Sequence, residues 1–117
     1  MAASSTLASV AMEHVVCLVT APPDRAHAIA EALVERELAA CVNIVALVHS
    51  IYRWQGAVEH DDESLLVVKT TRAAVPALTD ALGELHPYEN FELVALDIAG
   101  GAPAYLDWIG DSVKPPS

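Results

Sequence analysis

A long two-armed β segment from Leu38 to Thr71 constrains the fold of this chain more than any other stretch. Its two β-rich arms meet at Trp54-Gln55-Gly56-Ala57, where Gly56 can adopt the left-handed backbone conformation that a tight hairpin turn needs. At about 3.3 Å per residue, an unbroken first arm from Cys41 to Gln55 spans roughly 50 Å. A domain of this size has a radius of gyration of only about 13 Å. The hairpin tip must therefore project into solvent or lie on another copy of the chain.

The side chains of the first arm favour the second of these arrangements. Polar and apolar residues alternate cleanly only near the tip, where Ile51 and Arg53 oppose Tyr52 and Trp54. The base of the arm is apolar on both faces, so both faces should be covered. Tyrosine and tryptophan are enriched at protein interfaces, and their presence at the tip indicates contact with a second copy.

The composition sets the size of the domain and excludes some partners. The chain has 117 residues, enough for one domain with one core, and 54% of them are hydrophobic. No run approaches the ~20 apolar residues of a membrane span, so the apolar excess indicates burial between subunits rather than a membrane partner. Six basic residues stand against 16 acidic ones, for a net charge of −10, which disfavours a nucleic-acid partner.

The ends of the chain differ in composition from its middle. We expect residues 1–13 to be a flexible N-terminal extension, because they are small and polar and lack the basic start and apolar run of a signal peptide. A folded domain over residues 14–113 and a tail over residues 114–117 are expected to follow. These features, with only two cysteines, predict a cytoplasmic protein.

Hydrophobic periodicity predicts the remaining elements. Strands are expected over Glu13–Ala21 and Phe91–Ala99, and helices from an Asp24 N-cap to about Leu38, from near Ala73 to Leu85, and after Pro103. With the hairpin, the order is strand, helix, strand, strand, helix, strand and a final helix.

This order predicts an α+β fold, a ferredoxin-like βαββαβ sandwich with a C-terminal helix. The antiparallel sheet should have the strand order 4-1-3-2, with both main helices on one face. Cys17 and Cys41 would then be separated by a strand, so we expect no disulfide between them. The second strand would form a long apolar edge, which a closed ring of identical chains would cover.

Five motifs add a family resemblance to this prediction. ELAACVNIV, S-IYRWQG, LLVVKTT, ELHPYE and YLDWI stand in the order and spacing of the CutA divalent-cation tolerance proteins. The resemblance covers roughly Val15 to Val113, and the five motifs in order are highly specific. It implies a ferredoxin-like protomer in a tight homotrimer, and a cytoplasmic or organellar role linked to copper and other divalent cations.

Two departures from the family pattern lead to local expectations. Relatives carry Pro-Gly where this chain has Ala46-Leu47, which predicts a weaker kink in the second strand. Relatives carry Val-Pro where this chain has Asn90-Phe91, which predicts a different position for the loop beside His86.

His86 and Cys41 are the candidate metal ligands. His86 lies in a turn, and imidazole suits copper, although the same residue could instead cap the preceding helix. Cys41 could equally be a small buried apolar residue. His49 and His60 are expected on the hairpin surface. No local metal motif is present, so a site for Cu(II) or another divalent cation would be assembled across subunits, without an organic cofactor.

The resemblance also implies an intersubunit cleft lined by Tyr52, Trp54, Lys69, Glu89, Glu92, Tyr105 and Trp108. The aromatic residues among them could instead serve only interface packing. Lys69 ends an apolar strand and needs a carboxylate partner, for which Glu89 or Glu92 is available.

The sequence therefore predicts a trimeric divalent-cation tolerance protein that binds copper or other divalent metal ions. A PII-like trimeric regulator that binds a small molecule in the intersubunit cleft is the alternative, and a scaffold is a third class. An enzyme is not expected, because the sequence shows neither a nucleophile with its base nor a glycine-rich phosphate loop.

Overall fold

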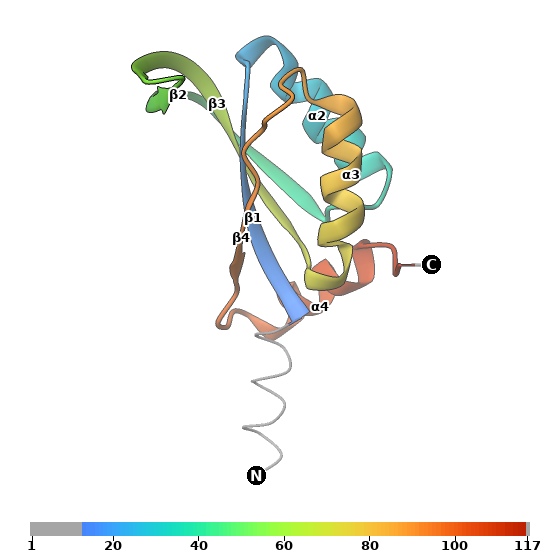
Figure 1. Ribbon diagram of the computed structural model, residues 1–117. Helices are drawn as coiled ribbons and strands as arrows, with labels where there is room; N and C mark the ends of the chain where they lie inside the picture. Colours follow the sequence, from blue (N-terminus) through green and yellow to red (C-terminus); the bar gives the residue numbers. More distant parts are fainter. Residues whose placement is uncertain (1–12, 117) are drawn as a thin grey trace.

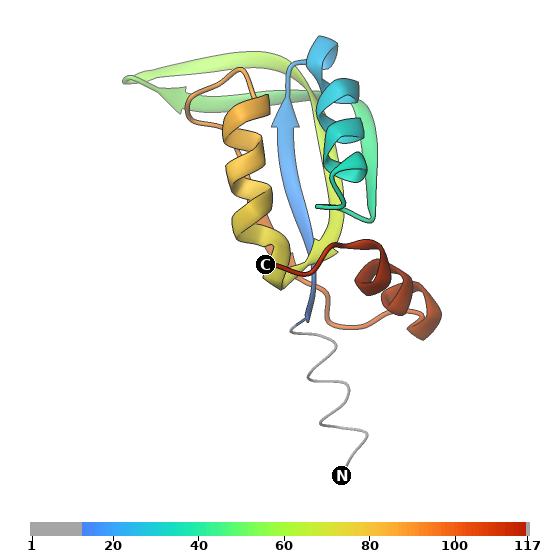
Figure 2. The same ribbon diagram turned by 90° about the vertical axis from the view of Figure 1, so that its right-hand side faces the viewer.

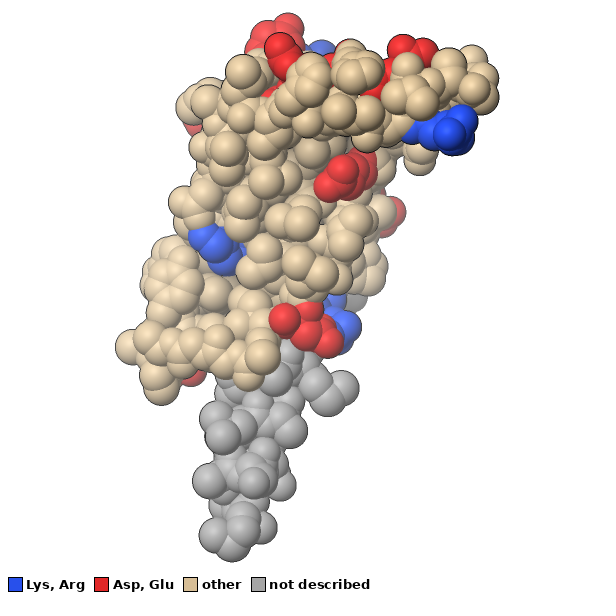
Figure 3. All heavy atoms as spheres, turned by 90° about the vertical axis from the view of Figure 1, so that its left-hand side faces the viewer, with Lys and Arg blue, Asp and Glu red and all other residues tan. Residues whose placement is uncertain are grey.

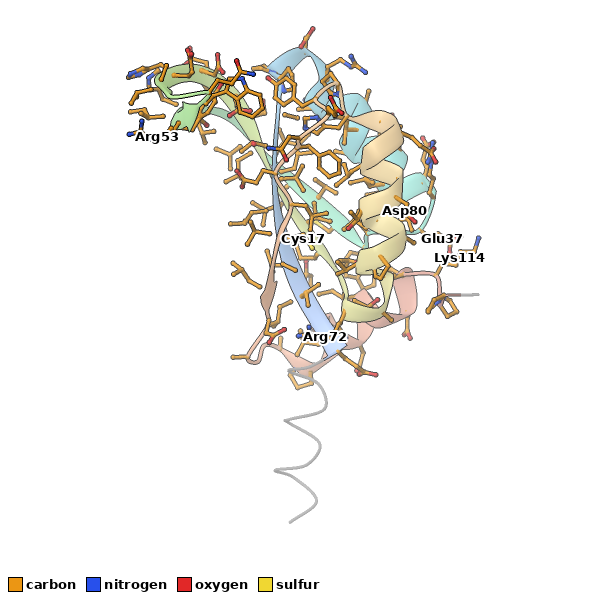
Figure 4. The ribbon with its side chains drawn as sticks, viewed as in Figure 1. Cys17, Glu37, Arg53, Arg72, Asp80 and Lys114 are labelled. Carbon is orange, nitrogen blue, oxygen red and sulfur yellow. The ribbon has the colours of Figure 1, made fainter. Side chains whose placement is uncertain are left out.

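The computed structural model describes residues 13–116, so the expected extension lies outside the described residues except for Glu13. The elements follow the predicted order: β1 (His14–Ala21), α2 (Pro23–Glu35), β2 (Cys41–Trp54), β3 (Ala57–Thr71), a 3₁₀ turn (Arg72–Ala74), α3 (Val75–Leu85), β4 (Val94–Asp97) and α4 (Pro103–Ser112). Lys114 is the first residue of the predicted tail. Its backbone N–H donates to the carbonyl of Glu37, just after α2, at 2.8 Å (Figure 4).

The four strands form one antiparallel sheet in the order β2-β3-β1-β4, which confirms the predicted topology. Helices α2 and α3 pack side by side on one face of this sheet (Figure 1; Figure 2). Because β3 separates β1 from β2, Cys17 and Cys41 lie on non-adjacent strands and both are free thiols. The prediction that they form no disulfide is confirmed.

The core fills the space between the sheet and the two helices. Alternate residues of β1 and β3 point toward the helices, which turn their predicted apolar stripes toward the sheet. The largest side chains that are less than 2% exposed include Leu33, Leu66, Leu78, Leu82 and Val19. Each such side chain contributes about 1.5–3 kcal/mol when it leaves water, so this layer holds α2 and α3 on the sheet.

The hairpin turn and the bend below it are the main features of β2 and β3. Gln55 and Gly56 have φ values of 49° and 83°, the left-handed conformation predicted for the tip. The strand register shifts between Val45 and Val48, which places one extra residue in β2 opposite Ser64. The Ser64 hydroxyl donates to the Ala46 carbonyl at 2.7 Å. Beyond this bulge the hairpin bends away from the helices and projects past the domain (Figures 1 and 2).

A bulge therefore forms at Ala46-Leu47 without Pro-Gly, and a weaker kink than Pro-Gly would give stays a prediction. A bulge needs an extra residue and a partner for the freed carbonyl, and the Ser64 hydroxyl supplies that partner without Pro-Gly.

Three element boundaries also differ from the prediction, and the first is the end of α2, which comes at Glu35 rather than at about Leu38 because Glu37 has a left-handed φ of 58°. Asp24 is not the N-cap of α2, because Pro22 takes that position and no side chain caps the helix. The fourth strand covers only Val94–Asp97 instead of residues 91–99. Phe91 packs against the core before the strand begins, and the nearby Thr20 carbonyl of β1 accepts a hydrogen bond from His86. Strand pairing with β1 therefore starts only at Val94.

The face of the sheet opposite the helices is apolar and bare in the single chain. Val45, Val94 and Leu96 on this face are 44%, 47% and 49% exposed. Figure 3 shows this side as a largely uncharged surface below the hairpin. Within the single chain, the prediction that both faces of the sheet are covered is therefore confirmed for one face only. Within residues 13–116, no helix is both long and apolar enough to cross a membrane.

Candidate functional site

The predicted site residues fall into two groups at opposite ends of the hairpin. One group surrounds the first residues of β2 and the last of β3, which pair Cys41 with Lys69. The other lies at the tip, where Trp54 pairs with Ala57. Thirteen residue steps separate Cys41 from Trp54, about 43 Å along a straight strand. One chain therefore cannot bring all seven predicted cleft residues into a single site.

The tip group lines an acidic and aromatic hollow of about 940 Å³ between the hairpin and the loop after α3. Four predicted cleft residues take part in it: Tyr52, Trp54, Glu89 and Glu92. The loop and β3 add Tyr88, Phe91, Asp61 and Glu63, and neither lysine nor arginine is among the lining residues. The hollow therefore combines negative charge with aromatic surface, the combination that receives cations.

Glu63 is the most buried carboxylate of this hollow. Glu63 is only 7% exposed, and its carboxylate has no hydrogen-bond or ion-pair partner among the described residues. Beside it, the Tyr52 hydroxyl donates to Asp61, and this hydrogen bond raises the pKa of Tyr52 to about 12. Burial and the Glu63 carboxylate raise the pKa of Tyr88. Both phenols therefore stay protonated at neutral pH, with the Tyr52 hydroxyl donating to Asp61.

His86 does not line the hollow, although it contacts three residues that do, and neither of its ring nitrogens is free. The residue is 7% exposed, its Nε2 lies 2.7 Å from the Thr20 carbonyl, and its Nδ1 accepts from the Tyr88 backbone N–H at 3.1 Å. These two contacts require the neutral Nε2–H tautomer. The ring stacks on Phe91 with centroids 5.4 Å apart, and the His86 backbone N–H caps α3 through the Leu82 carbonyl. His86 thus fixes the loop to β1.

The base group places Cys41, Lys69, Tyr105 and Trp108 near one another at the other end of the sheet. Lys69 donates to the Asn43 side-chain carbonyl, and the Cys41 thiol lies 3.9 Å from the same oxygen. Within the single chain, Lys69 does not reach Glu89 or Glu92, which lie in the tip group, so their pairing stays a prediction for the intersubunit cleft.

Two aromatic residues of α4 complete the base group. The rings of Tyr105 and Trp108 are 5.4 Å apart, and each residue is more than 40% exposed. Burial, with the Cys41 side chain contributing, raises the pKa of Tyr105. The pair is therefore available as an apolar contact surface at the base of the domain.

The single chain does not fit a metal ion at His86 and Cys41. His86 contacts Thr20, which pairs with Leu65, whereas Cys41 pairs with Lys69, four residues further along β3. Across residues 13–116 there is no group of three or more histidine, cysteine, aspartate or glutamate side chains placed to hold a metal ion. Metal binding by either residue therefore stays a prediction.

Sequence reasoning placed His49 and His60 on the surface and overlooked that they meet. The His49 Nε2 lies 3.3 Å from the His60 Nδ1, and the His49 Nδ1 lies 2.7 Å from Asp62. The turn at Gln55-Gly56 sets the register that makes these two histidines diagonal neighbours. Counting outward from that turn would have found them.

Comparison with known proteins yields one consistent family. The profile of the family "CutA1 divalent ion tolerance protein" matches residues 15–112. A relative from Thermus thermophilus, "Divalent-cation tolerance protein CutA", is 52% identical over 101 residues, which cover 86% of this chain and 98% of the relative.

Two solved structures extend the likeness to the fold. The divalent cation tolerance protein (Cut A1) from Thermus thermophilus superimposes with a TM-score of 0.85 at 52% identity, covering 86% of this chain and 99% of that one. A structure described as the PII-like protein CutA from Nostoc, in apo form, has a TM-score of 0.82 at 33% identity, covering 87% and 99%.

Proposed function

Because this chain belongs to the CutA1 divalent ion tolerance protein family, we propose that it acts as a homotrimer that binds divalent cations, Cu(II) among them. The observation that carries the proposal is the division of the predicted cleft residues between the base and the tip of one hairpin. A cleft that contains both groups requires at least two chains.

Three surfaces of the single chain support assembly. The open sheet face is apolar, β2 is an edge strand, and Trp54 at the tip is 48% exposed. Long apolar edges and large apolar patches are covered in soluble proteins, because bare ones aggregate. A closed ring in which each hairpin crosses its neighbour would cover all three surfaces at once.

Charge complementarity supports the same arrangement. The hollow at the tip is lined by Asp61, Glu63, Glu89 and Glu92, whereas the base group carries Lys69. If the base of one chain faces the tip of the next, Lys69 gains the carboxylate partner that it lacks within its own chain. The seven predicted cleft residues would then line one intersubunit site.

Cation binding is supported by the family and by the net charge of −10. Cu(II) heads the stability series of divalent ions at nitrogen and oxygen ligands. A role for His86 requires its ring to exchange a backbone contact for the metal, and a role for Cys41 requires ligands from a second chain.

Calorimetric titration of the full chain with Cu(II) tests the proposal. We expect saturable binding per chain, and titration without saturable heat would contradict cation binding. The His86→Ala variant then tests the predicted ligand, with His27→Ala, an exposed histidine of α2, as the matched control. A role for His86 predicts at least a tenfold loss of affinity (about 1.4 kcal/mol) in the first variant and none in the control. Equal affinities would leave His86 with its structural contacts alone.

A PII-like trimeric regulator that binds a small molecule in the intersubunit cleft is the second candidate function. The Glu63 carboxylate at the hollow favours it, because this group has no hydrogen-bond or ion-pair partner among the described residues and its oxygens remain open to solvent and to a ligand in the hollow. A small organic cation would fit the acidic and aromatic lining. An increase in melting temperature with such a ligand separates this function from a pure scaffold.

The cytoplasmic location and the absence of enzymatic activity stay predictions. The family is described by divalent ion tolerance, and that description names no reaction.

A further inference from the structure

Two histidines from neighbouring strands meet on one face of the projecting hairpin. His49 pairs with Asp62 and Ile51 pairs with His60, so the two imidazoles are diagonal neighbours across the strands. Their ring centroids are 5.4 Å apart, and the planes are inclined at 46°. The His49 Nε2 and the His60 Nδ1 lie 3.3 Å apart. Two metal-binding nitrogens thus converge on one place.

Asp62 holds His49 in the form that can bind a metal. Its Oδ1 lies 2.7 Å from the His49 Nδ1, so this nitrogen carries a proton that it donates to the carboxylate. In the neutral imidazole the lone pair is then on Nε2, which faces His60. Metal-binding histidines generally donate their second ring nitrogen to a carboxylate in this way, which fixes the ring and raises its basicity.

The separation of the two nitrogens also fits a shared metal ion. Two nitrogens that each lie about 2.0–2.1 Å from one tetrahedral zinc ion are roughly 3.3–3.4 Å apart. The distance in the structure is 3.3 Å. Without metal, one proton shared between the two rings accounts for the same contact. When a metal ion binds, the neutral His60 ring carries its one proton on Nε2 instead of on Nδ1, which leaves the Nδ1 lone pair for the metal.

The surroundings allow a cation to enter and to complete its coordination. The His49 and Asp62 side chains are 57% and 61% exposed in the chain, so water can fill the remaining positions. The arm that carries His60 also carries Glu59, Asp61, Asp62 and Glu63, which make the local field negative.

We propose that His49 and His60 together bind a divalent transition-metal ion, with Asp62 as the group that positions His49. This site gives a location to the cation binding proposed above and rests on that proposal. It lies on the hairpin, separate from His86 and Cys41, and it uses two imidazoles rather than a thiolate. Imidazole pairs bind zinc, copper and nickel ions. The site is therefore expected to bind these transition-metal ions rather than magnesium or calcium.

Titration of the full chain with Zn(II), followed by calorimetry, tests the site. We expect one Zn(II) per chain, lost or weakened at least 100-fold in His49→Asn and in His60→Asn. Asp62→Asn should weaken binding by about 10–100-fold, the usual effect of removing such a partner. His27→Asn is the matched control, because it removes an exposed histidine that has no second imidazole beside it, and it should leave binding unchanged.

The outcomes separate this inference from the proposed function. If the parent chain binds neither Zn(II) nor Cu(II), both fail. If the parent binds and the His49 and His60 variants bind equally well, or if His27→Asn weakens binding as much as they do, the hairpin site alone is overturned. If a variant unfolds, NMR of the imidazole nitrogens in the parent chain tests the site instead. Zn(II) should shift the resonances of His49 and His60 first, and uniform shifts of all five histidines would contradict the site.

Discussion

At the residue scale, the sequence predicted which side chains are important more successfully than it predicted their contacts. It placed His86 in a turn and offered a helix cap as the alternative to metal binding, and the structure shows its backbone N–H in the capping position. It could not show that both ring nitrogens are engaged, because Thr20 lies 66 residues away in the chain. Lys69 likewise contacts Asn43 through strand pairing, and no local pattern reveals that contact.

Cys17 gives a prediction at this scale. The side chain is fully buried in the centre of β1 (Figure 4), and burial raises the pKa of its thiol from 9.0 to about 11. The folded chain holds this proton more tightly than the unfolded chain, so the associated stability is complete below about pH 9 and is lost toward pH 11. In a Cys41→Ser variant, Cys17 should not react with a thiol reagent at pH 8 until the chain is denatured.

The denatured form is the control for that experiment. Without reductant, it should titrate one free thiol in the variant and two in the parent chain, since neither cysteine forms a disulfide. Equal reaction rates for the folded and denatured variant would contradict the burial of Cys17.

At the element scale, periodicity and turn chemistry predicted most of the fold. The apolar stripes identified both packed helices, and Gly56 marked the hairpin turn. The sequence missed the bulge at Ala46, because its stabilising hydroxyl comes from Ser64 on the facing strand. It also made β4 too long, since Phe91 has strand propensity but is used in the core.

The bulge gives a prediction for the hairpin. Ser64→Ala removes the hydroxyl that donates to the Ala46 carbonyl, and Ser64 is only 3% exposed, so water cannot easily replace it. The free energy of unfolding should fall by about 1 kcal/mol or more. Urea denaturation at one fixed protein concentration measures the change as a lower midpoint with an unchanged slope. Ser50→Ala, on the outer part of the same hairpin, is the control and should have a smaller effect. Equal midpoints for both variants would show that the Ser64 contact does not stabilise the bulge.

At the scale of the whole molecule, the single chain leaves a large apolar surface uncovered. Its helices cover one face of the sheet, the other face stays apolar and bare, and the hairpin extends past the domain (Figures 1 and 3). The residues of the predicted cleft are divided between the two ends of that hairpin. The length and the apolar base of β2 predicted this uncovered surface from the sequence, whereas contacts between chains cannot be read from the pattern of one chain.

Sedimentation equilibrium of the full chain at low micromolar concentration tests the trimer most directly. The account predicts a single species with the mass of three chains of 12.4 kDa each, stable across the concentration range. Such a species would cover the open sheet face and the β2 edge and bring Lys69 of one chain to the acidic hollow of another. A single species with the mass of one chain would contradict the account, because the apolar face and the projecting tip would then remain in solvent.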